Sequence, residues 1–114
     1  TPNGLENALR TLRTKASPWR LIAVFGSAGK RDVGKRALMG SIAVKLADIT
    51  VVTSEDPRGE LEIINRQIVD GAKKAGGVTG KNIFVIDNRG EAIDFAVNKL
   101  AKKGDTIGIF GKGK

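Results

Sequence analysis

The chain has 114 residues, a formal net charge of +8, no cysteine and no histidine. This length suits one compact domain with its own hydrophobic core. Without cysteine there can be no disulfide framework or thiolate metal site, and without histidine the commonest metal ligand and general base is missing. Because no apolar stretch could span a bilayer and no secretory leader is evident, we expect a single domain over residues 1–114, located in the cytoplasm.

The excess of basic residues raises the question of nucleic-acid binding. Lysine and arginine are spread from Arg10 to Lys114 without a dense block, and only one Trp, four Phe and no Tyr are available to stack on bases. We therefore expect the positive charge to serve a solvated surface or small anions. A basic nucleic-acid-binding domain remains the minority alternative.

A helix is expected over residues 1–16, with Thr1 as its N-cap, Pro2 at its first helical position and Ser17-Pro18 beyond its end. Apolar residues recur in it at helical spacing and form one face. This face comprises Leu5, Leu9 and Leu12. Residues 20–25 follow, and their apolar run Leu21–Phe25 predicts a buried strand.

The segment GSAGKRDVGKRALMG, residues 26–40, leads from this strand into a helix expected from about Gly34 to Ala47. From Gly29 it reads G-K-R-D-V-G-K-R, which departs from the phosphate-cradling pattern G-x-x-x-x-G-K-[ST] at the last position. Arg36 stands where a hydroxyl would coordinate magnesium, and its fixed charge would repel the metal. The loop suits an anion at a helix N-terminus, but it does not predict nucleotide hydrolysis.

Three further strands are expected at 49–53, 83–87 and 106–110, separated by helices at about 60–75 and 89–103. Asn88 and Glu91 form a capping-box pattern for the last helix. The expected core-facing residues of the three internal helices are Leu38, Ile42 and Leu46; Leu61, Ile64 and Ile68; and Ile93, Val97 and Leu100. This alternation predicts an α/β fold: a Rossmann-like, open, mostly parallel sheet of about four strands with helices on both faces.

Unusual residues follow the carboxyl ends of the predicted strands, where open α/β sheets bind ligands. The segments are GSAGKRDVGKR after the first strand, SEDPRGE (54–60) after the second, DNRGE (87–91) after the third and GKGK (111–114) after the fourth. Helix capping accounts for DNRGE, to which we assign no chemistry, and SEDPRGE alone would be a helix start. Together, arginines, lysines and carboxylates beside a Gly-Lys-Gly turn predict a pocket for an amino acid or for the phosphate end of a nucleotide.

These segments, in this order, resemble the C-terminal domain of the Mur ligases. The opening TPNGLE resembles the family's Thr-Pro-Asp-Ala-Leu-Glu, and residues 25–40 resemble Phe-Gly-x-x-Gly-Asp-Arg-Asp-x-x-Lys-Arg-Pro-Leu-Met-Gly, with Lys30 and Ala37 as departures. Residues 55–58, EDPR, stand where the family has an amino-acid-selecting Asp-Asn-Pro-Arg. Residues 111–113 begin the family's Gly-Lys-Gly-His-Glu, from which the chain departs at Lys114. The closest branch comprises the UDP-N-acetylmuramoyl-dipeptide ligases that add the third amino acid, diaminopimelate or lysine.

The resemblance implies that residues 1–114 are the amino-acid-binding domain of an ATP-dependent ligase of peptidoglycan synthesis, whose N-terminal and central ATPase domains are absent from this chain. Such ligases activate a peptide carboxylate with ATP as an acyl phosphate, which the amine of the incoming amino acid attacks. ATP and Mg²⁺ would serve the full-length enzyme, and this domain alone would bind neither and be inactive. The implied partners are the diamino acid, UDP-N-acetylmuramoyl-dipeptide and the central domain in cis, with no nucleic acid and no membrane.

The resemblance also implies the strand order 3-2-1-4, with residues 26–36 and 111–114 adjacent at the point where the order reverses. Within this domain it implies no catalytic residue and no metal ligand. The residues that it implies for the amino-acid substrate are Arg31, Glu55, Asp56, Arg58 and Gly111. The residues that would either brace the first loop or face ATP are Asp32, Lys35 and Arg36. A free-standing nucleotide- or anion-binding module is the main alternative, and a P-loop domain upstream in the reading frame would exclude it.

Overall fold

The computed structural model describes residues 2–16, 19–26, 33–53 and 61–110. Four strands form one sheet in the order β3-β2-β1-β4, and every pair is parallel. The strands are β1 (Leu21–Phe25), β2 (Ile49–Val52), β3 (Ile83–Val85) and β4 (Thr106–Ile109). The predicted open parallel sheet and its strand order are therefore confirmed.

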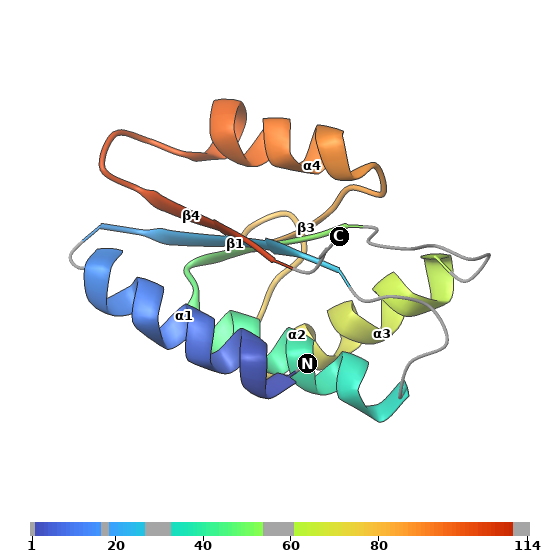
Figure 1. The fold of residues 1–114 in the computed structure, drawn as a ribbon. Helices are drawn as coiled ribbons and strands as arrows, with labels where there is room; N and C mark the ends of the chain where they lie inside the picture. The colour runs from blue at the N-terminus through green and yellow to red at the C-terminus, as the bar shows by residue number, and fades with distance from the viewer. Residues whose placement is uncertain (1, 17–18, 27–32, 54–60, 111–114) are drawn as a thin grey trace.

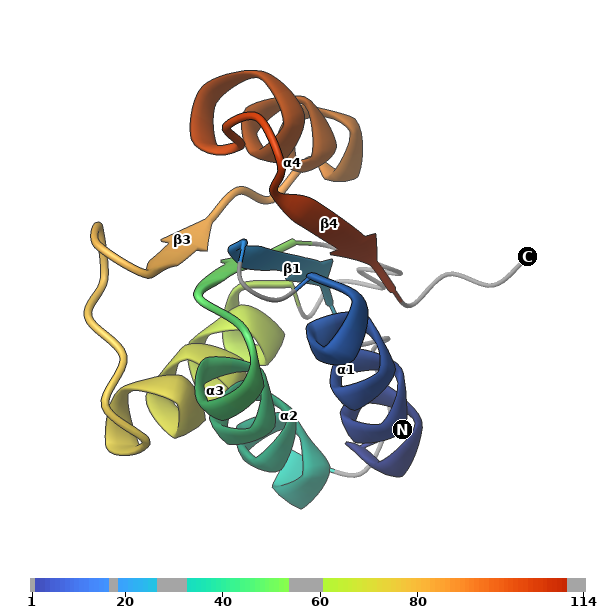
Figure 2. The same ribbon diagram turned by 90° about the vertical axis from the view of Figure 1, so that its left-hand side faces the viewer.

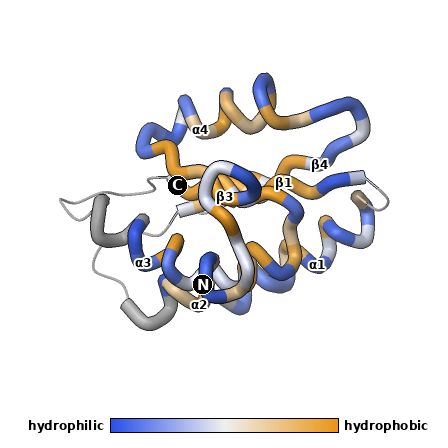
Figure 3. Tube along the Cα trace, turned by 180° about the vertical axis from the view of Figure 1, so that it is seen from behind, coloured by the Kyte–Doolittle hydropathy of each residue, from blue (hydrophilic) through white to orange (hydrophobic). Residues whose placement is uncertain are grey.

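Helices cover both faces of this sheet, as predicted. They are α1 (Pro2–Ala16), α2 (Val33–Leu46), α3 (Leu61–Lys74) and α4 (Arg89–Phe95), the last continued by the π-helical turn η1 (Ala96–Leu100). Figures 1 and 2 show α1, α2 and α3 together on one face and α4 alone on the other. In the hydropathy colouring of Figure 3, β1 is hydrophobic in the middle layer, whereas the helices mix hydrophobic and hydrophilic residues.

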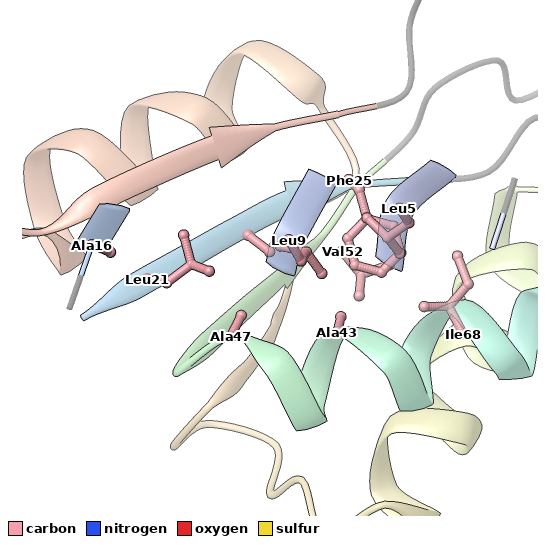
Figure 4. Close-up of a cluster of buried hydrophobic side chains, with 10 residues drawn as sticks. Leu5, Leu9, Ala16, Leu21, Phe25, Ala43, Ala47, Val52 and Ile68 are labelled. Carbon is pink, nitrogen blue, oxygen red and sulfur yellow. The ribbon is translucent and has the colours of Figure 1, made fainter. Parts of the chain in front are cut away.

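The two apolar cores follow from the alternation of side chains along the strands. Leu21, Ala23 and Phe25 point to the three-helix face, and Ile22 and Val24 point to the α4 face. Figure 4 shows the first core, where side chains of α1, β1, α2, β2 and α3 meet. Because both faces of the sheet are covered, β1 is buried along its whole length, which explains its continuous apolar sequence.

Two glycines let α2 and α3 approach each other closely. A Cβ atom added at Gly40 would lie 1.9 Å from the carbonyl oxygen of Ile68, and one added at Gly71 would lie 1.9 Å from that of Ala37. Any side chain at either position would force the backbones apart. The contact fixes α2 directly against α3, the two helices that begin after the segments 27–32 and 54–60.

Two predicted helix faces were each wrong at one residue. Ile42 and Leu46 of α2, and Ile93 and Leu100 of the last helix, pack against the cores as expected, whereas Leu38 and Val97 do not. Leu38 is 50% exposed, because α2 turns the face formed by Arg36, Gly40 and Ala43 inward. Small residues suit a helix that packs against two other helices and the sheet. In the last helix, Val97 is 47% exposed and alanines form the buried contact, since the π-helical turn interrupts the α-helical period on which the prediction rested.

The last helix also ends three residues earlier than predicted, at Leu100 instead of residue 103. The backbone becomes extended at Ala101, and Gly104 adopts a positive φ of 96° in the turn that follows. The carboxylate of Asp105 accepts a hydrogen bond from the Lys102 N–H (2.8 Å), and the Leu100 carbonyl accepts one from Arg20 Nη2 (2.8 Å). These contacts stabilise a turn where the helix would otherwise continue.

Two aspartates hold the amino end of β1. Asp48, directly before β2, accepts hydrogen bonds from the Leu21 N–H (2.7 Å) and from Arg13 Nη2 (2.7 Å). Asp105, directly before β4, accepts from Arg20 Nε (3.1 Å) and Nη2 (2.7 Å). The central strand is thereby tied to both of its neighbours at the end where it starts.

Asp105 is the more deeply buried of the two carboxylates, with its side chain 4% exposed. The hydrogen bond from the Arg20 side chain lowers the pKa of this carboxyl below its ordinary value, and it outweighs burial, which by itself would raise the pKa. The ionised form is therefore the one that the fold stabilises.

Candidate functional site

The carboxyl ends of the four parallel strands lie along one edge of the sheet. The residues that follow the strands there are Gly26, Thr53, Ile86 and Phe110. The chain steps from β1 to β2 to β3 and then crosses to β4 on the other side of β1, so the strand order reverses between β1 and β4. Ligands of open α/β sheets bind at such a reversal. This edge is the candidate site.

Most of the predicted site residues lie outside the described part of the chain. These residues are Arg31, Asp32, Glu55, Asp56, Arg58 and Gly111. Lys35 belongs to α2, but its side chain is also outside the described part. The segments that carry the six residues follow β1, β2 and β4, which are three neighbouring strands. The assignments, and the adjacency of residues 26–36 and 111–114, stay predictions.

Arg36 is the predicted site residue whose side chain the structure describes. It is the fourth residue of α2, is only 2% exposed, and donates a hydrogen bond from Nη1 to Gln67 Oε1 of α3 (2.8 Å). A buried guanidinium is tolerated only when its surroundings satisfy it, and the amide oxygen of Gln67 contributes to this. Arg36 therefore links the first half of α2 to α3, close to the carboxyl end of the sheet.

The connection from β3 to α4 begins with a helix cap. The Asn88 side chain accepts a hydrogen bond from the Glu91 N–H (2.8 Å), so Asn88 is the N-cap, as its spacing from Glu91 predicted. The cap fixes where α4 starts and how the chain approaches it from β3.

The same connection also contacts the neighbouring strands, which the sequence did not indicate. The Ile86 N–H donates to the Val52 carbonyl (2.9 Å), and Thr53 Oγ1 donates to the Asp87 carbonyl (3.2 Å). Arg89 Nη1 donates to the Phe110 carbonyl (3.3 Å). One signal could have pointed to Arg89: a cation at the first position of a helix opposes the helix dipole, so a reason other than helix stability is expected for it.

The side chains of residues 3–16, 19–26, 36–53 and 66–110 include no group of three or more His, Cys, Asp or Glu that could hold a metal ion. Over the described ranges, no helix is long and apolar enough to cross a membrane.

Comparison with known proteins gives consistent matches along the chain. Residues 1–113 match the family model described as Mur ligase, glutamate ligase domain. The chain is 46% identical over 114 residues to UDP-N-acetylmuramoyl-L-alanyl-D-glutamate--2,6-diaminopimelate ligase 1 of Clostridium acetobutylicum, covering 99% of this chain and 22% of that protein. It is 47% identical to the UDP-N-acetylmuramoyl-L-alanyl-D-glutamate--2,6-diaminopimelate ligase of Prochlorococcus marinus, covering 99% of this chain and 21% of that protein.

A solved structure of a UDP-N-acetylmuramoyl-L-alanyl-D-glutamate--2,6-diaminopimelate ligase also matches. It superposes with a TM-score of 0.79 at 39% sequence identity, covering 99% of this chain and 22% of that one. The chain thus spans about a fifth of the length of the relatives that it matches.

Proposed function

Because the chain belongs to the Mur ligase family, as its glutamate ligase domain, we propose that it is the amino-acid-binding domain of an ATP-dependent ligase that adds 2,6-diaminopimelate to UDP-N-acetylmuramoyl-L-alanyl-D-glutamate. One observation carries the proposal: 46% identity to a 2,6-diaminopimelate ligase of this acceptor extends over 99% of the chain. The likeness therefore includes the strands, the helices and the segments between them.

We assign the amino acid to the segments that follow β1, β2 and β4. Arg58 offers a planar guanidinium that can bind a carboxylate through two parallel hydrogen bonds. Glu55 and Asp56 offer negative charge for an ammonium group. Diaminopimelate carries both groups at the end remote from the reacting amine, whereas lysine carries only the ammonium. Arg31 and Gly111 complete the proposed set from the two neighbouring strands.

Arg36 acts in this proposal as a brace and does not contact ATP. Its support is the burial of the side chain and its hydrogen bond to Gln67. This bond joins α2, which follows the segment of Arg31 and Asp32, to α3, which follows the segment of Arg58. The contact thereby fixes α2 and α3, the helices that follow the two segments, against each other. For Asp32 and Lys35, bracing and contact with ATP remain open.

ATP and Mg²⁺ belong, in this proposal, to the full-length enzyme. ATP supplies the phosphoryl group that activates the carboxylate of the acceptor peptide. The contribution of this chain is to hold the amine of the incoming amino acid in the correct position and orientation for attack, which can account for a large part of the rate of a two-substrate reaction. We expect the chain by itself to bind neither ATP nor Mg²⁺ tightly and to be inactive.

The direct test is to express the whole reading frame that contains this chain. The purified protein is incubated with UDP-N-acetylmuramoyl-L-alanyl-D-glutamate, ATP and Mg²⁺, and with diaminopimelate or lysine in parallel. We expect phosphate release that depends on diaminopimelate, with a product whose mass has increased by one diaminopimelate residue. Turnover with lysine alone would overturn the assigned amino acid. A reading frame without an upstream ATPase domain, or no ligation with either amino acid, would overturn the proposed activity and favour a binding module.

A further inference from the structure

Residues 86–89, which we call the 86–89 turn, form hydrogen bonds to the ends of β2 and β4, two strands that are not neighbours. On one side the turn is bound to the end of β2, through the Ile86 N–H to Val52 (2.9 Å) and the Thr53 hydroxyl to the Asp87 carbonyl (3.2 Å). On the other side Arg89 donates to the Phe110 carbonyl at the end of β4 (3.3 Å). The end of β1 lies between these two attachment points, because β2 and β4 flank β1.

Thr53 and Phe110, which the 86–89 turn contacts, are the last described residues before the two proposed substrate segments. Thr53 directly precedes the segment 54–60, which carries Arg58, and Phe110 directly precedes Gly111. Thr53 is buried and Arg89 is partly buried, so both contacts are shielded from water to some degree. A shift of the 86–89 turn would therefore be passed to the start of both segments.

Neither contact is needed to form the element that bears it. The parallel pairing of β2 with β3 is complete without the Thr53 hydroxyl. Helix α4 is capped by Asn88, and a cation at its first position opposes the helix dipole. The placement of Arg89 is explained by the carbonyl that it reaches on the far side of β1.

We propose that Thr53 and Arg89 are positioning residues, which set the spacing between the ends of β2 and β4, from which the Arg58 segment and the Gly111 segment start. The inference rests on the proposed function, which assigns the amino-acid substrate to these segments. Neither residue touches the substrate in this account. Each acts through the backbone of the segment whose start it fixes.

The test uses the full-length enzyme with Arg89→Ala, Arg89→Lys, Thr53→Val and Thr53→Ser. Losing one hydrogen bond that positions a substrate should raise the KM for diaminopimelate about three- to tenfold in Arg89→Ala and Thr53→Val. The KM for ATP should change less than twofold. Arg89→Lys and Thr53→Ser keep a donor at the same place, so they should recover at least half of the loss on a logarithmic scale.

Arg13→Ala is the matched control. Arg13 also donates to a backbone carbonyl, that of Leu46 (3.1 and 3.2 Å), but at the opposite end of the sheet. It should lower the melting temperature and leave the KM for diaminopimelate unchanged.

Each outcome of the experiment decides something. Arg89→Ala and Thr53→Val could both lower the melting temperature as Arg13→Ala does and leave the KM for diaminopimelate unchanged. This result would overturn the positioning role and leave the proposed function standing. Equal rises in the KM for ATP and for diaminopimelate would also overturn it. A wild-type enzyme without diaminopimelate-dependent turnover would overturn the proposed function and this inference with it. If Arg89→Ala fails to fold, the pair Thr53→Val and Thr53→Ser gives the same comparison.

Discussion

At the amino end of the sheet, β1 is held between two aspartates that each pair with an arginine, whereas the contacts described at the carboxyl end run to uncharged oxygens. The amino-end pairs are Arg13 with Asp48 and Arg20 with Asp105, both at 2.7 Å. The carboxyl-end acceptors are the amide oxygen of Gln67 and the carbonyls of Asp87 and Phe110. The ion pairs at the amino end stabilise the fold. The carboxylates that we propose to bind a substrate follow the strands at the other end.

Several lysines also lie on the amino-end side of the sheet. The last turns of the helices, which lead into the amino ends of the strands, contain Lys15, Lys45, Lys73, Lys74 and Lys99. Cations are favourable there because the helix dipole places partial negative charge at helix C-termini. Part of the net charge of +8 therefore has a structural explanation on the side opposite the candidate site.

The largest expected effect on stability is that of Asp105→Ala. Removing this buried carboxylate leaves the Lys102 N–H without its acceptor and the Arg20 guanidinium with only the Leu100 carbonyl of its described acceptors, and should lower the free energy of unfolding by about 2–4 kcal/mol. Denaturant unfolding followed by the fluorescence of Trp19, the only tryptophan, measures it. Trp19 packs over Gly104 and is 55% exposed, so its signal should change on unfolding.

The control for this variant is Asp70→Ala. Asp70 is an exposed aspartate of α3, and its removal should change the free energy of unfolding by no more than about 0.5 kcal/mol. Equal losses in the two variants would show that the amino-end carboxylate does not hold the fold.

Asp48→Ala should cost less, about 1–2 kcal/mol, because this carboxylate is more exposed and water can replace part of its contacts. Most of the loss should come from the buried Leu21 N–H, which loses its acceptor. A double-mutant cycle with Arg13→Ala separates the two contributions and should give a coupling energy below about 1 kcal/mol. A coupling as large as the whole loss would assign the stabilisation to the ion pair.

Asn88→Ala tests the carboxyl end and should cost about 1 kcal/mol through the lost N-cap of α4. Asn88→Asp should remain close to wild type, since aspartate caps helices as well as asparagine does. Both are measured by the same unfolding experiment. A loss above that of Asp105→Ala would reverse the expected difference between the two ends.

The smallest effect is on the pH dependence of stability. The pKa of Asp105 is lower in the native state than in the unfolded state, so the unfolded state binds the proton more readily and the contribution of this group is lost as pH falls. The stability advantage of wild type over Asp105→Asn should be full above about pH 5 and should shrink below about pH 4, near the ordinary aspartate pKa. Unfolding curves from pH 7 down to about pH 3 measure it, and an advantage that is constant over this range would contradict it.

The sequence predicted the sheet and the family because both depend on patterns that span the chain. Apolar strands alternating with helices specify a parallel sheet, and four motifs in order identified the family that the comparisons confirm. The inward faces of α2 and α4 were harder to predict. Leu38 has the expected spacing, yet Gly40 and Gly71 let two backbones meet, and a helix–helix contact of this kind is not visible in the period of one helix.

The site was predictable only in part, for a related reason. Motifs mark side chains that meet a ligand, whereas Arg89 and Thr53 act through backbone carbonyls that any residue could provide. Arg36 showed the opposite difficulty. The sequence left open whether it braces the first loop or faces ATP, because a motif does not show that a side chain is buried, and the structure shows Arg36 buried against Gln67.

The most direct test of the proposed division between the two ends is the steady-state kinetics of Arg58→Ala in the full-length enzyme, with each substrate varied in turn. Losing a charge-assisted, two-point contact should raise the KM for diaminopimelate about tenfold to hundredfold, with the constants for ATP and the nucleotide-linked peptide little changed. Arg58→Lys should recover only part of this affinity, because a lysine cannot form the two-point contact. An unchanged KM for diaminopimelate, with a stability shift below about 1 kcal/mol, would instead make Arg58 a surface ion-pair residue and contradict the proposed site.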